Sequence, residues 1–116
     1  MFRIFTKDLL AAEIFVTLAK KMTGASPSLT DDPDAKEDLV VLGSDASNTF
    51  TARLVLEKRM DIPKIRAGSD DYFMQSLKEN GRTILILGGG RPRALLYAVY
   101  AFFESKGCAY FWDGDV

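Results

Sequence analysis

The sequence predicts an α/β (α+β) sandwich of two or three layers, with three helices packed on a small mixed sheet. Two unbroken apolar runs, Leu39–Leu42 and Ile84–Leu87, are typical of strands that are covered on both faces. Asn80-Gly81 lies between two strand-like stretches and indicates a tight hairpin turn. A chain of 116 residues is long enough for one compact core, so residues 1–116 are expected to form a single domain.

The chain begins with a short stretch, Phe2–Phe5, that we expect to be an edge strand. A helix from about Lys7 to Met22 follows. Thr6 is expected to cap this helix, and Gly24 to end it in the left-handed conformation. Four-residue spacing predicts the inward face, which consists of Leu10, Ile14, Leu18 and Met22 with Ala11 and Phe15 beside them.

Residues 25–36 are predicted to form a polar loop. This loop contains Asp31, Asp32 and Asp34, but it lacks the central glycine and the closing glutamate of an EF-hand calcium loop. We therefore expect no metal site here.

A central strand is predicted at Asp38–Leu42, parallel to the strand that precedes the first helix. The next helix should run from about Thr49 to Arg59. Its inner face is expected to contain Phe50, Leu54 and Val55.

The second half begins with a hairpin of Tyr72–Leu77 and Thr83–Leu87. Its second strand leads through three glycines into a helix from about Arg93 to Lys106, with Pro92 suited to the first helical position. A last short strand is expected at Ala109–Trp112.

The composition excludes several classes of function. Apolar residues make up 47% of the chain, charged residues 27%, and the formal net charge is −1, as in ordinary globular proteins. This charge balance gives no field that would attract nucleic acid or a membrane surface. The chain has no histidine, the commonest general base, and its one cysteine, Cys108, leaves no internal disulfide. We expect no catalytic residues and no cofactor in this chain.

The glycine turn is the sharpest candidate site. A strand, Gly88-Gly89-Gly90 and a helix N-terminus can cradle an anion, and Arg91 and Arg93 could add charge. However, the turn lacks both the Gly-Lys-Ser/Thr ending of a P-loop and the G-x-G-x-x-G pattern. A structural turn is therefore the favoured interpretation.

Aromatic residues are concentrated from Tyr97 to Trp112, and exposed aromatic rings are common at sugar-binding surfaces. Core packing together with a contact to another domain is the preferred explanation. Asp113 and Asp115 resemble the carboxylate pair of glycoside hydrolysis, but a chain end is a poor scaffold for that geometry.

The segment GG-x-x-RALLYAVYAFFE-x-x-GC-x-YFWDGD resembles the end of the N-terminal accessory domain of large multidomain glycoside hydrolases. These enzymes include α-glucuronidases, hexosaminidases and α-N-acetylglucosaminidases. The resemblance covers roughly the last third of the chain. It implies a non-catalytic domain that packs on and supports a catalytic (β/α) barrel, which this chain lacks.

Further expectations follow from this resemblance. The helix stretch Ala94–Phe103 has no charged residue, so almost its whole circumference should avoid water, covered by the barrel or by self-association of an isolated chain. Arg91 and Arg93 should then pair with carboxylates across the domain contact. The parent protein is expected to be exported and to contact glycan, although Met1–Lys20 carries charges that no secretion signal would have. We expect the chain to be an excised fragment.

Two alternatives remain open at this stage. One is a stand-alone anion- or nucleotide-binding module that uses the glycine turn, and the other is a carbohydrate-binding module that uses Trp112. Across all three hypotheses the candidate contact residues are Gly89, Gly90, Arg91, Arg93, Tyr97 and Trp112.

Overall fold

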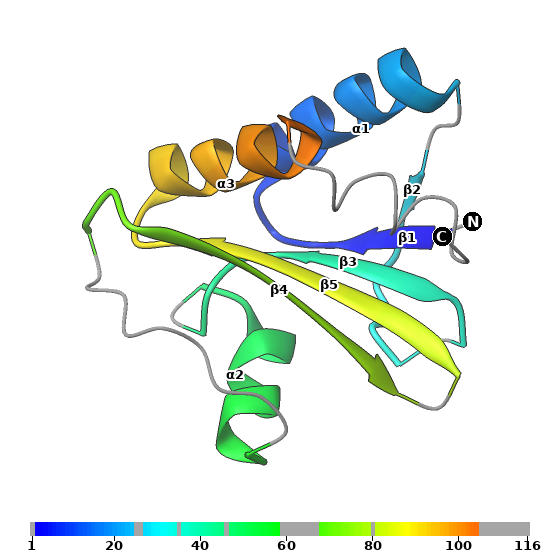
Figure 1. The fold of residues 1–116 in the computed structure, drawn as a ribbon. Coiled ribbons are helices and arrows are strands. Elements are labelled where there is room, and N and C mark those ends of the chain that lie inside the picture. The colour runs from blue at the N-terminus through cyan, green and yellow to red at the C-terminus, as the bar shows by residue number, and fades with distance from the viewer. Residues whose placement is uncertain are drawn as a thin grey trace.

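A computed structural model describes residues 2–24, 27–34, 36–45, 47–58, 68–79 and 81–104. Helices and strands alternate along most of the chain (Figure 1). In chain order they are β1 (Phe2–Phe5), α1 (Leu9–Thr23), β2 (Ser28–Leu29), β3 (Asp38–Leu42), α2 (Thr49–Leu56), β4 (Tyr72–Glu79), β5 (Arg82–Gly89) and α3 (Pro92–Glu104).

The sheet has the strand order β2-β1-β3-β5-β4. β3 is its central strand: Val40 pairs with Ile4 of β1 and with Leu85 of β5, and both pairings are parallel. β4 pairs with β5 in the antiparallel direction. The predicted mixed sheet, the central parallel strand and the hairpin are confirmed. The prediction of β1 as an edge strand is wrong, because β2, inside the predicted polar loop, pairs with its outer side.

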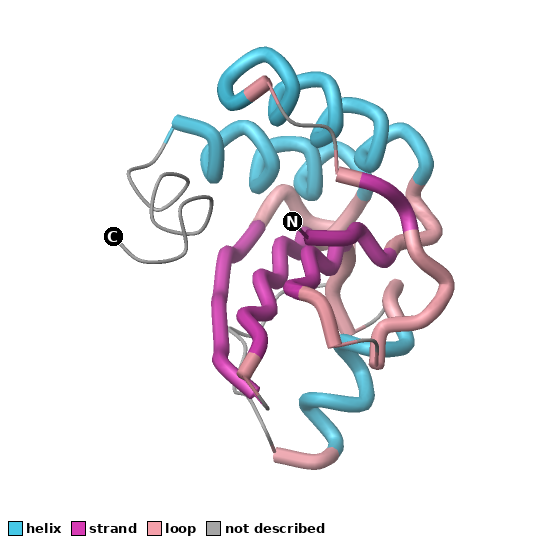
Figure 2. The backbone as a smooth tube through the Cα atoms, turned by 90° about the vertical axis from the view of Figure 1, so that its right-hand side faces the viewer, coloured by secondary structure: helices cyan, strands magenta, loops and turns pink. Residues whose placement is uncertain are grey.

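The helices cover both faces of this sheet, which makes a three-layer sandwich. α1 and α3 lie side by side on one face, and α2 lies on the other (Figures 1 and 2). Alternate residues of each central strand face opposite layers. Val40, Leu42, Leu85 and Leu87 therefore join the core under α1 and α3, whereas Leu39, Val41, Ile84 and Ile86 join the core over α2.

The cap and the inward face of α1 differ from the predictions. Asp8, not Thr6, is the N-cap, and its side chain accepts a hydrogen bond from the Ala11 amide. The Thr6 hydroxyl instead donates a hydrogen bond of 2.7 Å to the carbonyl oxygen of Leu42, at the end of the adjacent strand β3.

The buried stripe of α1 is centred on small residues and one aromatic ring, which are Ala11, Ala12, Phe15 and Ala19. Leu10 and Met22, predicted to point inward, are 57% and 55% exposed. The small alanines allow α1 to lie close to the sheet, and Phe15 fills the remaining space.

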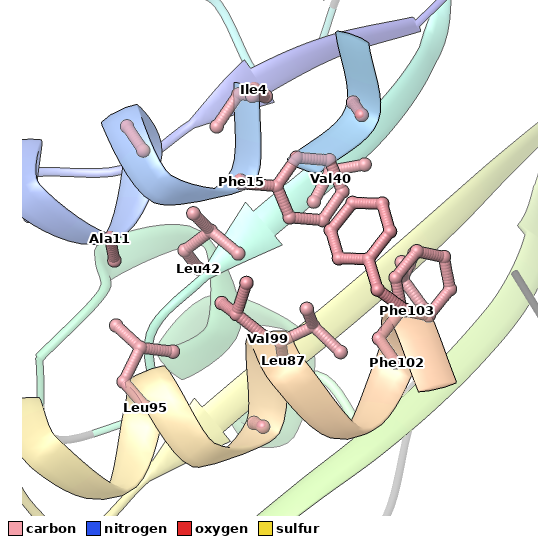
Figure 3. Packing of buried hydrophobic residues seen from close by; sticks show 14 residues of the cluster. Ile4, Ala11, Phe15, Val40, Leu42, Leu87, Leu95, Val99, Phe102 and Phe103 are labelled. Carbon is pink, nitrogen blue, oxygen red and sulfur yellow. The ribbon is translucent and has the colours of Figure 1, made fainter. Parts of the chain in front are cut away.

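One side of α3 is buried within the domain itself. The ring of Phe15 on α1 stacks on Phe102 at 5.9 Å and contacts Phe103 at 4.8 Å, between ring centroids (Figure 3). The buried residues of α3 are Ala94, Leu95, Ala98, Val99, Phe102 and Phe103. In the single chain Tyr97 and Tyr100 are 44% and 45% exposed, so the expectation that a barrel or a second copy covers this side of α3 stays a prediction.

The last strand predicted at Ala109–Trp112 lies outside the described residues, as do Asp113 and Asp115. Within the described part of the chain, no helix combines the length and the apolar character needed to cross a membrane.

Candidate functional site

The carboxyl ends of β1, β3 and β5 meet at one edge of the sheet, because these three strands are parallel. From this edge the chain continues from β1 and β5 into α1 and α3 on one face, and from β3 into α2 on the other (Figure 2). Adjacent loops that leave a sheet edge in opposite directions open a crevice between them, where α/β proteins commonly bind ligands.

A cavity of about 740 Å³ occupies this crevice. All three strand-to-helix loops line it. Its polar lining comes from Thr6, Lys7, Asp8, Ser44, Ser47 and Arg91 together with the backbone of Gly43, Gly89 and Gly90, and its apolar lining from Leu9, Leu42, Pro92 and Leu95.

The first wall of the cavity is held by a chain of hydrogen bonds. The Thr6 hydroxyl donates to the Leu42 carbonyl and accepts from the Asp8 amide at 3.0 Å. Asp8 in turn caps α1 through the Ala11 amide. These contacts fix Lys7 between two anchored residues, and its side chain is exposed at the rim.

The second wall is the loop from β3 to α2. The Gly43 amide donates to the Leu87 carbonyl at 2.7 Å, and Asn48 caps α2 by accepting from the Phe50 and Thr51 amides. Gly43 has φ of +147°, and a Cβ there would lie 2.7 Å from the Asn48 Cβ. Only glycine fits this position.

The third wall is the predicted glycine turn, whose glycines let β5 pack closely against Phe73 and against the start of α3. A Cβ on Gly88 would lie 2.4 Å from the Phe73 ring, and one on Gly89 would lie 2.5 Å from the Leu95 amide nitrogen. The Gly90 amide donates to the Asp71 carbonyl at 2.9 Å, so it is already bonded within the protein. These contacts favour the structural interpretation of the turn over a phosphate cradle.

Arg91 and Arg93 share one carboxylate of their own chain. Arg91 Nε lies 2.7 Å from Asp70 Oδ1, and Arg93 Nη2 lies 2.9 Å from Asp70 Oδ2. Hydrogen bonds from both arginines, with the larger effect from Arg91, hold the pKa of Asp70 well below its ordinary value of 3.8. The same bonds raise the pKa values of both guanidinium groups. Within the chain, Asp70 is therefore the carboxylate that both arginines contact. Their predicted pairing with carboxylates of another domain remains a prediction.

Tyr97 lies away from the cavity, on the outer surface of α3. Arg93, Tyr97, Tyr100 and Glu104 follow one another at four-, three- and four-residue spacing, so they form one stripe along the helix. All four are exposed, and we call them the outer α3 stripe. Trp112, the remaining candidate, lies outside the described residues.

The structure therefore divides the predicted site residues between two places. Gly89, Gly90 and Arg91 belong to the cavity edge, whereas Arg93 and Tyr97 belong to the outer α3 stripe. Sequence reasoning missed Lys7 and Ser47, which the cavity also contains. Their position directly after parallel strands is the signal that could have found them.

Within the described ranges, no three His, Cys, Asp or Glu side chains gather where they could hold a metal ion. No family model matches the chain, and no curated protein matches it.

Proposed function

We propose that the chain is a non-catalytic N-terminal accessory domain of a glycan-degrading glycoside hydrolase, which packs against and supports the catalytic barrel. The resemblance of the α3 region to such domains supports this proposal. The exposed outer α3 stripe is the structural observation that carries it.

The stripe is not needed to complete the core. The opposite side of α3 already fills the space over the sheet with Leu95, Val99 and Phe102, which are at most 5% exposed. Tyr97 and Tyr100 face solvent on the side of α3 opposite the buried one, and they supply a large apolar area with polar tips. Tyrosine is enriched at protein–protein contacts for this reason.

Charged side chains flank these tyrosines along the helix. Arg93 and Glu104 stand at the two ends of the stripe. An apolar centre with charged residues at its margin is the usual anatomy of an interface between domains.

The experiment is co-expression of this chain with the separately tagged segment that follows it in the reading frame. We expect the two to co-purify, because the proposed contact belongs to the folded domains and does not need the peptide bond between them. Tyr97→Ser combined with Tyr100→Ser should weaken this association by at least about tenfold, since interfacial tyrosines are frequent hot spots.

Leu56→Ser is the matched control. Leu56 is 81% exposed and ends α2 on the opposite face of the sheet, so its replacement should leave co-purification unchanged. Equal retention of the double tyrosine variant and the wild type would contradict the proposed contact. A following segment that does not encode a barrel would contradict the proposed class of parent protein.

A further inference from the structure

We infer that the cavity at the carboxyl edge of the sheet binds a small organic anion, with its phosphate or carboxylate group between Lys7 and Arg91. The inference rests on the cavity, its charges and its lining. It does not depend on the outer α3 stripe, and it holds whether or not the chain docks on a barrel.

The position of the cavity is the first argument. It lies where the loops after β1 and β5 diverge from the loop after β3, and all three loops line it. Its volume of about 740 Å³ is in the range of sites for small molecules. The three loops are anchored by hydrogen bonds at Thr6, Gly43 and Gly90, so the walls are formed before any ligand arrives.

The charge around the cavity is the second argument. Lys7 lines it from the loop after β1, and Arg91 lines it from the loop after β5. Asp70 binds Arg91 through Nε, and a guanidinium carries further N–H donors on its Nη atoms. Two arginines share Asp70, so that cluster keeps a net positive charge. Asp8 caps α1 and adds a negative charge to the lining, so that with Asp70 two carboxylates stand against the three cations Lys7, Arg91 and Arg93. The positive ends of α1 and α3 both face this edge.

The rest of the lining indicates an organic body rather than a bare ion. Leu42, Leu95 and Pro92 offer an apolar surface. Ser44 and Ser47 lie in the loop between β3 and α2. A few polar groups beside a mostly apolar wall is the common composition of small-molecule sites. Phosphorylated and carboxylated sugars both combine such a body with one anionic group.

The test is a titration of the full 15N-labelled chain, followed by amide chemical shifts at constant ionic strength. The probes are glucose 6-phosphate, glucuronate, inorganic phosphate and glucose, each at millimolar concentration. Glucose 6-phosphate, glucuronate or both should shift the amides of Gly43, Ser47, Gly89 and Gly90 more strongly than inorganic phosphate does. Glucose, which lacks the charge, should leave these amide chemical shifts unchanged.

Two exposed lysines at opposite ends of α1 provide the matched variants. Lys7→Glu should weaken binding of the organic anion about tenfold, because it reverses a charge at the site. Lys20→Glu, in the last turn of α1, should change it by less than about twofold. The inference is overturned by the absence of shifts with both organic anions, by equal shifts with glucose or with inorganic phosphate, by shifts centred away from the cavity, or by equal losses in the two variants.

Discussion

The ring of Phe15 on α1 lies 4.8 Å from the ring of Phe103 on α3, measured between centroids, and the two planes are inclined by 58°. This contact joins two helices that are distant in sequence and closes the apolar side of α3 within the domain. It also explains why so apolar a helix can exist in a chain of this size. What α3 leaves to solvent is a narrow stripe, not a whole surface.

Phe15→Ala should lower the free energy of unfolding by about 3–5 kcal/mol, because it removes a fully buried ring that also supports Phe102 and Phe103. Urea denaturation followed by circular dichroism measures this loss. Leu56→Ala, at a position that is 81% exposed, should change stability by less than about 0.5 kcal/mol. Similar losses in both variants would show that Phe15 is not a core residue.

Gly89→Ala should destabilise the domain by about 1–3 kcal/mol, because the new Cβ meets the backbone of α3 at Ala94 and Leu95. A comparison with Gly24 separates steric contact from backbone strain. Gly24 has φ of +79° and open space around it, so Asn there should be tolerated better than Ala. At Gly89 the order should reverse, with Asn worse than Ala. The same order at both positions would contradict this account.

Asn48→Ala should cost about 1–2 kcal/mol of stability, because the side chain caps α2 through the Phe50 and Thr51 amides and is 4% exposed. Asn48→Ser retains a capping oxygen and should recover part of the loss. Thermal unfolding of the two variants checks the prediction. A serine variant no more stable than the alanine variant would show that the cap contributes little.

The Asp70 carboxyl group should titrate well below 3.8 because Arg91 and Arg93 both bind its charged form. The native state therefore holds this proton less firmly than the unfolded state does. The stability that the group contributes is present above 3.8 and is lost as the pH falls through the lower native pKa.

Carboxyl carbon chemical shifts of Asp70, recorded against pH, measure this pKa directly. Replacement of both arginines by glutamine should return it toward 3.8. High salt should also weaken the shift, since all three side chains are exposed. An unchanged pKa in the double variant would contradict the assignment of its cause.

Apart from β2, the order of the described helices and strands could be predicted from the sequence, because each has its own periodicity and end signals. The hairpin, the central strand β3 and the first residue of α3 at Pro92 were predicted from such local signals. Tertiary contacts decided the remaining details. Thr6 and Asp8 are both suitable caps, and Asp8 takes this role while Thr6 bonds the Leu42 carbonyl.

The inward face of α1 illustrates the same limit. Leu10 and Met22 belong to a stripe as regular as the stripe of Ala11, Phe15 and Ala19, and only the close approach of the sheet selects the second. The candidate site was predicted in part. The glycine turn was identified, but Lys7 and Asp70 are brought to it by strand order and by the loop before β4, which local patterns do not contain.

Chemical nitration of Tyr97 and Tyr100, read by mass spectrometry of their peptides, tests the proposed accessory role most directly. The reaction is compared between the 116-residue chain and the same domain joined to the catalytic barrel that the proposal assigns to its parent protein. We predict that both tyrosines react readily in the isolated chain, where they are 44% and 45% exposed, and are protected in the longer protein. Equal reactivity in the two proteins would contradict the proposal that the outer α3 stripe lies against a catalytic barrel.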